Sequence, residues 1–195
     1  MKYIIAGTDR PDSNTLKVAH YIQRIYKNLG EDVGVIDLRE VKEHLHTGPH
    51  YGKDNETEGI KLYLEQVKNS DGLIIVCPEY NGSMPGILKY FIDHFRFPES
   101  FEFRPVCFVG LGGIFGGLRP VEHLQQVFGY RNSFIYPERV FMMNVWKVIS
   151  KEGDVQDEML KQLLNQQASG FQKFTKALAD HKLDANARIA AHAKK

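Results

Sequence analysis

Hydrogen-bonding and aromatic side chains are gathered in one short segment, residues 78–86, with the sequence Pro-Glu-Tyr-Asn-Gly-Ser-Met-Pro-Gly. The segment follows the apolar run at residues 73–77 and precedes a stretch with helical spacing of apolar residues. Ligands of open α/β sheets bind in loops at the carboxyl ends of strands. We therefore predict a loop that binds a flat ligand, and its candidate contacts are Pro78, Glu79, Tyr80, Asn81, Gly82 and Ser83.

A second polar loop, residues 7–15, follows the apolar run at residues 2–6. Its possible donors are Thr8, Arg10, Ser13, Asn14 and Thr15. Together with the free N–H groups of the helix that begins here, they predict a phosphate site. The alternative is that Ser13 or Asn14 only caps the helix. Asp9 and Asp12 would repel a phosphate, so we expect both to point outward.

A third loop is rich in glycine, at positions 110, 112, 113, 116 and 117. It does not fit the Gly-x-Gly-x-x-Gly register of dinucleotide-binding proteins, and the chain has no P-loop sequence. Gly112, Gly113 and Gly116 would let backbone amides approach a planar ring without an intervening Cβ atom. The alternative is a tight turn between a strand and a helix.

Apolar patterns indicate the elements that carry these loops. Strands are predicted at residues 2–6, 33–38, 73–77, 106–109 and 140–148, and helices at 16–29, 60–67, 87–95, 118–128 and 159–178. This alternation predicts an α/β fold of three αβα layers, a doubly wound, five-stranded parallel sheet with the flavodoxin-like order 2-1-3-4-5. Residues 1–184 form the predicted domain, and residues 185–195 either extend the last helix or fray.

Composition narrows the possible partners. The chain has 195 residues, which suits one domain, and a formal charge of +1, which gives no reason to expect nucleic acid or an anionic membrane as partner. The first residues are too short an apolar run for a signal peptide, so we expect a cytoplasmic protein. Cys77 and Cys107 lie in apolar runs and are predicted core residues. His44, His46 and His50 could suggest a metal, but we favour loop histidines, because no further ligand stands at a recognised spacing.

These motifs resemble those of the NADPH-dependent FMN reductase family, which includes quinone, azo-dye and chromate reductases of flavodoxin-like fold. The resemblance is carried by Gly7-Thr8-x-Arg10-x-x-Ser13-Asn14, by residues 78–89 with Ile92-Asp93, and by Gly112-Gly113-x-x-Gly116-Gly117-x-Arg119. It implies an FMN whose phosphate is held by Thr8, Arg10, Ser13, Asn14 and Thr15. The isoalloxazine ring would then lie against residues 78–83 and the glycine loop.

The resemblance also implies a reaction. Hydride would pass from NADPH or NADH to the flavin, and electrons onward to a small-molecule acceptor such as a quinone, azo compound, free flavin or metal oxyanion. No catalytic triad or carboxylate pair stands out, so we predict no catalytic side chain. Glu79 is predicted to bind backbone amides of its own turn, and Tyr80 to be a stacking wall. One face of the flavin would serve both substrates in turn, which predicts ping-pong kinetics.

Two other functions stay open at this point, and so does the oligomeric state. An FMN electron carrier without pyridine-nucleotide activity is disfavoured because flavodoxins are acidic, and a non-redox module could share the fold. The segment at residues 86–95 carries Tyr90, Phe91, His94 and Phe95, more aromatic surface than one sheet face should absorb. With the resemblance, this predicts a homodimer or a dimer of dimers whose interface includes this helix and whose active site needs the partner chain. The alternative is that all four side chains pack inward.

Overall fold

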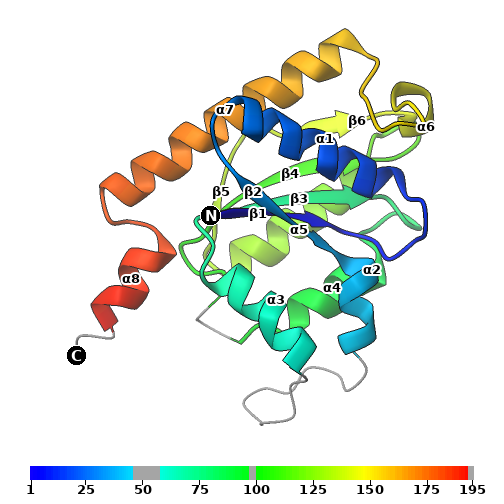
Figure 1. Cartoon of the computed structure of the whole chain (residues 1–195). Helices are drawn as coiled ribbons and strands as arrows, with labels where there is room; N and C mark the ends of the chain where they lie inside the picture. The colour runs from blue at the N-terminus through cyan, green and yellow to red at the C-terminus, as the bar shows by residue number, and fades with distance from the viewer. Residues whose placement is uncertain (46–57, 97–99, 193–195) are drawn as a thin grey trace.

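A parallel sheet of six strands forms the centre of the computed structural model, which describes residues 1–45, 58–96 and 100–192 (Figure 1). The strands are β1 (Lys2–Ala6), β2 (Val33–Asp37), β3 (Leu73–Pro78), β4 (Pro105–Leu111), β5 (Phe134–Ile135) and β6 (Val140–Met142). Their order is β2-β1-β3-β4-β5, and β6 also pairs with β4. The predicted order 2-1-3-4-5 is therefore confirmed.

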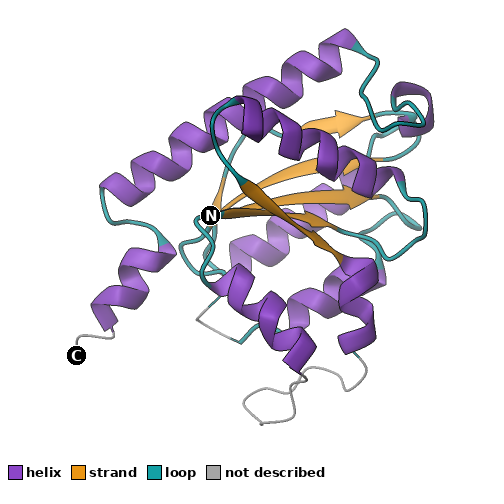
Figure 2. Cartoon of the chain, viewed as in Figure 1, coloured by secondary structure: helices purple, strands orange, loops and turns teal. Residues whose placement is uncertain are grey.

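Helices cover both faces of the sheet, as Figure 2 shows. On one face lie α1 (Asn14–Asn28) and α7 (Glu158–Asp180), and on the other lie α3 (Glu58–Lys68), α4 (Gly86–Asp93) and α5 (Leu118–Tyr130). Shorter helices are α2 (Leu38–Val41), η1 (Lys42–His44), α6 (Val145–Val148) and α8 (Ala185–His192). Within the described residues, no helix is both long and apolar enough to cross a membrane.

The central strands are buried on both faces, as expected for parallel strands between two helical layers. Cys107 packs on the side of α1 and α7, whereas Cys77 packs on the side of α4 and α5. Both thiols are free and buried, and this burial raises the pKa of each. The prediction that both cysteines are core residues is confirmed.

The predicted fifth strand at residues 140–148 is wrong in its second half. Only Val140–Met142 is extended, and the chain then turns through Asn144, whose φ of +46° leads into α6. The fifth position in the sheet is shared: β5 pairs with the start of β4, and β6 pairs with its carboxyl end. This turn places residues 145 and 146 beyond the edge of the sheet instead of inside it.

The aromatic residues in and just after α4 also differ from the prediction, which expected part of their surface to be exposed. Phe91 and Phe95 are 0% and 3% exposed, and their rings contact edge to face at a centroid distance of 5.0 Å. The ring centroids of Phe95 and Phe101 are 4.9 Å apart, so these aromatic side chains pack against one another in the core. His94 is buried too, and its Nδ1 donates to the carbonyl oxygen of Tyr90 at 2.8 Å. The argument for an exposed aromatic interface on this helix was therefore wrong.

The end of the described chain forms a helix of its own. The backbone turns at Lys182, where φ is +55°, before α8 begins. Asn186 lies close to the buried guanidinium of Arg104, and the guanidinium of Arg188 lies 3.4 Å from the ring centroid of Phe103. The part of the 185–195 segment that the structure describes is thus neither an extension of α7 nor frayed.

Candidate functional site

Three loops meet at the carboxyl edge of the sheet and line one cavity of about 200 Å³. The loops follow β1, β3 and β4, which Figure 1 labels together with α6, and α6 adds two lining residues. The lining residues are Arg10, Ser13, Asn14, Thr15, Pro78, Glu79, Tyr80, Leu111, Gly112, Gly113, Val145 and Trp146. Nine of the fourteen predicted site residues are in this set. These nine residues are separated by up to about one hundred positions in the sequence, and the fold brings them together.

The start of α1 supplies hydrogen-bond donors to this cavity. Ser13 Oγ accepts from the N–H of Leu16 at 3.3 Å, so Ser13 does cap the helix, as the alternative interpretation held. The N–H groups of Asn14 and Thr15 belong to the first turn of α1, where they have no partner within the helix, and both residues line the cavity. The cap and an anion site are compatible, because the cap uses only one of the free N–H groups. Asp12 is exposed and Asp9 lies 4.0 Å from the ammonium of Lys42.

Thr8 joins two of the loops instead of lining the cavity. Its hydroxyl shares a hydrogen bond of 2.8 Å with the hydroxyl of Tyr80 and accepts from the N–H of Arg10 at 3.3 Å. Thr8 is only 1% exposed. Its hydroxyl thereby joins Tyr80 to the loop after β1, so Thr8 acts on the predicted site through its neighbours.

The tip of the loop after β3 is a tight two-residue turn. Tyr80 and Ser83 exchange both backbone hydrogen bonds, at 2.9 and 3.1 Å, across Asn81 and Gly82. The φ angles of Asn81 and Gly82 are +50° and +80°, which suits an Asn-Gly pair. Asn81, Gly82 and Ser83 do not line the cavity, and the Ser83 hydroxyl instead shares a 2.8 Å hydrogen bond with His123 Nδ1 on α5.

Glu79 has a partner that the sequence did not indicate. Its carboxylate accepts from Arg119 Nη1 at 2.8 Å, whereas we expected it to bind amides of its own turn. The backbone N–H of Glu79 donates to the carbonyl oxygen of Leu111 at 2.8 Å. Glu79 therefore ties the loop after β3 to both ends of the glycine loop.

Gly116 and Gly117 stand where the backbone of their loop packs closely against other backbone segments. A Cβ atom on Gly117, whose φ is +83°, would lie 2.4 Å from the backbone nitrogen of Leu111. One on Gly116 would lie 3.1 Å from backbone atoms at residues 141–143, and Gly116 does not line the cavity. The tight-turn interpretation therefore accounts for these two glycines. Gly113 differs, since it lines the cavity and a Cβ there would meet only the ring of Trp146, at 3.7 Å.

Leu111, Val145 and Trp146 line the cavity but were missed by the sequence analysis. The reason is the strand predicted through residue 148, which placed Val145 and Trp146 inside the sheet. The available signal was Asn144, a residue that readily adopts positive φ and ends strands.

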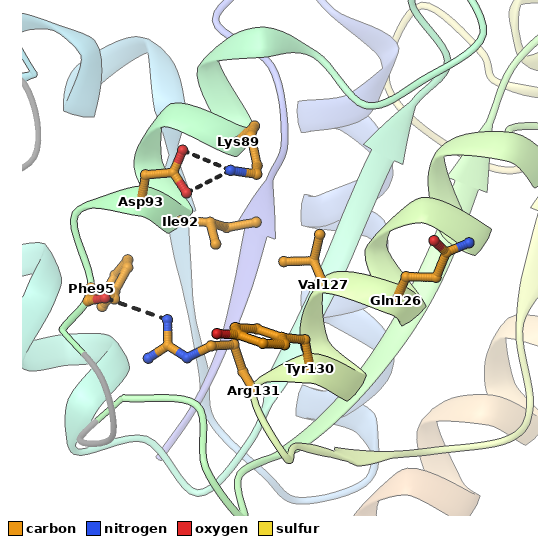
Figure 3. A pocket seen from close by; sticks show the side chains of 8 residues that line it. All are labelled: Lys89, Ile92, Asp93, Phe95, Gln126, Val127, Tyr130 and Arg131. Carbon is orange, nitrogen blue, oxygen red and sulfur yellow. Dashed lines mark hydrogen bonds and ion pairs between the residues drawn. The ribbon is translucent and has the colours of Figure 1, made fainter.

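A larger hollow of about 530 Å³ lies elsewhere, between α4 and α5 (Figure 3). Its wall includes Ile92, Val127 and Tyr130, with the ion pair of Lys89 and Asp93 at its rim. No strand end opens into it and no helix begins there, so size alone does not make it the ligand site. Among the described residues no group of His, Cys, Asp and Glu could hold a metal; His46 and His50 lie outside them.

Comparison with known proteins identifies the family. Residues 3–147 match the model of the NADPH-dependent FMN reductases. The chain belongs to this family. It is 29% identical over 128 residues to an FMN-dependent NADPH-azoreductase of Staphylococcus saprophyticus, covering 64% of this chain and 66% of the relative. It is 33% identical over 120 residues to a quinone reductase of Escherichia coli K12, a match that covers 59% of this chain and 64% of the relative. The matched region thus spans slightly less than two thirds of these relatives.

Solved structures of low sequence identity share the fold. An NADH:FMN oxidoreductase, EmoB in its apo form, superimposes with a TM-score of 0.72 at 20% identity and 87% coverage of both chains. FerB of Paracoccus denitrificans, a flavoenzyme NAD(P)H:(acceptor) oxidoreductase, gives 0.66 at 19% identity, covering 90% of this chain and 96% of its own. The predicted flavodoxin-like architecture is confirmed.

Proposed function

We propose that this protein is an FMN-dependent oxidoreductase that uses NADPH or NADH to reduce a small-molecule acceptor such as a quinone, azo compound, free flavin or metal oxyanion. One observation carries the proposal: donors suited to a phosphate and walls suited to a flat ring line the same cavity. Family membership supports the same reaction class.

The residues present fit an FMN. At one end, the guanidinium of Arg10 and the start of α1 offer charged and neutral donors to a phosphate. At the other end, Pro78, Tyr80 and the backbone at Gly112–Gly113 provide apolar and flat surfaces for a ring. When bound, the flavin supplies hydride acceptance from reduced nicotinamide and electron transfer to the acceptor.

In this proposal the side chains at the site bind and orient the flavin and the substrates and take no direct part in the reaction. Glu79 is held in an ion pair with Arg119, so its carboxylate serves to position the loop after β3. The hydroxyl groups of Tyr80 and Thr8 share a hydrogen bond, which holds the Tyr80 ring in place beside the cavity. The overall balance with a quinone is one NADPH and one proton consumed, with NADP⁺ and hydroquinone formed. We therefore keep the prediction that no side chain is required as a catalytic acid or base.

The decisive experiment is anaerobic reduction of the FMN-loaded protein. The expected result is a yellow protein whose flavin absorbance bleaches on addition of NADPH or NADH and returns when a quinone or azo compound is added. A yellow protein that neither nucleotide bleaches would instead be an electron carrier, and a protein that binds no FMN would belong to neither class. Initial rates at several concentrations of both substrates should give the parallel double-reciprocal lines of a ping-pong mechanism.

We further propose a homodimer or a dimer of dimers, with the hollow between α4 and α5 as the contact face. Tyr130 beside this hollow is 81% exposed, next to the apolar side chains of Ile92 and Val127. A second copy of the chain would cover it. Tyr130→Glu should then halve the mass measured by light scattering, whereas Met159→Glu on α7, 69% exposed, should not change it. A wild-type protein that is a fully active monomer would refute this proposal.

The extent of the functional domain and its location belong to the same proposal. Residues 1–184 are proposed as the FMN-binding domain, so a chain ending at residue 184 should keep its FMN affinity but unfold at a lower temperature. The loss of stability follows from the contacts of Asn186 and Arg188 with the body of the protein. A cytoplasmic location, where reduced nicotinamide is available, is proposed and is tested by cell fractionation.

A further inference from the structure

Trp146 is unusually exposed for the position it occupies. Its side chain is 59% exposed, although Val145 beside it is buried at 8% exposure and belongs to the core. Exposed indole leaves a large apolar surface in water, and a tryptophan in this state often marks a surface that another molecule covers. Trp146 lines the candidate cavity, so the surface to be covered is the wall of that cavity.

The backbone around Trp146 is firmly held. The N–H of Asn144 donates to the carbonyl oxygen of Gly113 at 2.9 Å, and that of Val145 donates to Gly112 at 3.3 Å. A further hydrogen bond of 2.7 Å from Lys147 to Asn144 closes the turn. The indole is therefore carried on a short turn fixed to the glycine loop, and its exposure does not come from a loosely attached segment.

The ring also lies close to the glycine loop itself. A Cβ atom on Gly113 would lie 3.7 Å from Cη2 of Trp146, which is an ordinary van der Waals distance. The indole thus stands beside the bare backbone of Gly113, with the loop of Pro78, Glu79 and Tyr80 lining the same cavity. A flat ring entering between these walls would cover apolar indole surface that is now in water.

We propose that Trp146 is a flavin contact, the outer wall of the FMN site, whose indole packs against the isoalloxazine ring. The inference rests on the proposed function, because it requires FMN in this cavity. It adds a residue from outside the three loops that the sequence motifs mark. Since the chain contains a single tryptophan, one indole signal reports on this wall alone.

The first test is nuclear magnetic resonance of the ¹⁵N-labelled apo protein titrated with FMN. The indole N–H of Trp146 should shift with FMN occupancy, and by more than the backbone amides of α3, which lie away from the cavity. Occupancy is measured separately, by ultrafiltration of free flavin. Bound FMN with an unmoved indole signal would overturn the role of Trp146 and leave the proposed function standing, whereas absence of FMN binding would overturn both.

The second test compares variants. Trp146→Ala should raise the Kd for FMN about 2- to 10-fold, the range for loss of one aromatic contact, and Trp146→Phe should restore most of the affinity. Met159→Ala is the control, because Met159 is 69% exposed on α7 and does not line the cavity. Equal affinities for wild type and Trp146→Ala would refute the proposal. So would an indole signal in apo protein that changes with protein concentration, because a second copy would then cover the ring.

Discussion

Replacing Arg10 with alanine should weaken FMN binding without weakening the fold. The Arg10 side chain is exposed and lines the cavity. Within the described part of the chain, the hydrogen bond of Arg10 that bears on the fold runs from its backbone N–H to Thr8 Oγ1, and it survives the substitution. A hydrogen bond between a charged donor and a phosphate contributes about 1.5–3 kcal/mol. The expected rise in Kd is therefore roughly 10- to 150-fold, with little change in the unfolding temperature of the apo protein.

The assay is titration of apo protein with FMN by flavin fluorescence, together with thermal unfolding of each apo variant. Lys42→Ala is the matched control: it also removes one positive charge near the phosphate loop, where Lys42 lies 4.0 Å from Asp9, but Lys42 does not line the cavity. Ser13→Ala differs from Arg10→Ala in the apo protein, because loss of the helix cap costs about 1 kcal/mol of stability before any FMN is added.

Salt provides an independent check on the same prediction. Because the guanidinium of Arg10 is exposed, its attraction to a phosphate is screened over about 8 Å at physiological ionic strength. FMN affinity of the wild type should therefore fall more steeply with salt than that of Arg10→Ala. An affinity unchanged in Arg10→Ala, or a loss matched by Lys42→Ala, would refute the assignment of the phosphate to this loop.

Three further predictions concern the fold. Gly117→Ala should destabilise the protein by at least about 2 kcal/mol in urea unfolding, because its φ is positive and its Cβ would meet backbone, whereas Gly113→Ala should be nearly neutral; equal effects would contradict the geometry. Cys77 and Cys107 should not react with a thiol reagent in the native protein at pH 8, because burial raises both thiol pKa values, and both should react in denaturant. Arg104→Met should cost about 3 kcal/mol, at about 1 kcal/mol for each donor removed from the carbonyl oxygens of residues 68, 70 and 100; a near-neutral value in urea unfolding would refute this.

The sequence was sufficient for the central part of the fold. The runs that became β3 and β4 are apolar without alternation, which is typical of strands covered on both faces, and the helices between them show a clear period of 3.6. The carboxyl ends of such strands lie on one edge, so the three polar loops could be brought together by topology alone. Local pattern and global arrangement agree in this part of the chain.

What the sequence could not provide are interactions between residues distant along the chain. Glu79 pairs with Arg119, forty positions away, and nothing in the local sequence prefers that partner to the amides of its own turn. The Phe95 ring is buried against Phe101, and its carbonyl oxygen accepts from Arg131 Nη1. Neither contact is contained in the helical pattern at residues 86–95. At residues 140–148, an apolar run fits either a strand or a strand followed by a turn, and only the fit of Asn144 to the glycine loop selects the second.

The cavity owes its shape to bonds between loops that are independent of any ligand. Thr8 binds Tyr80, Glu79 binds Arg119, and the N–H of Gly112 donates to the carbonyl oxygen of Met142 at 3.2 Å, so each loop is tied to another. Loops ordered during folding lose little further conformational freedom when a ligand enters. The order of the cavity therefore comes from contacts among all the loops at this edge of the sheet. The donors of Arg10 and α1, with the apolar side chains beside them, determine which ligand the cavity can bind.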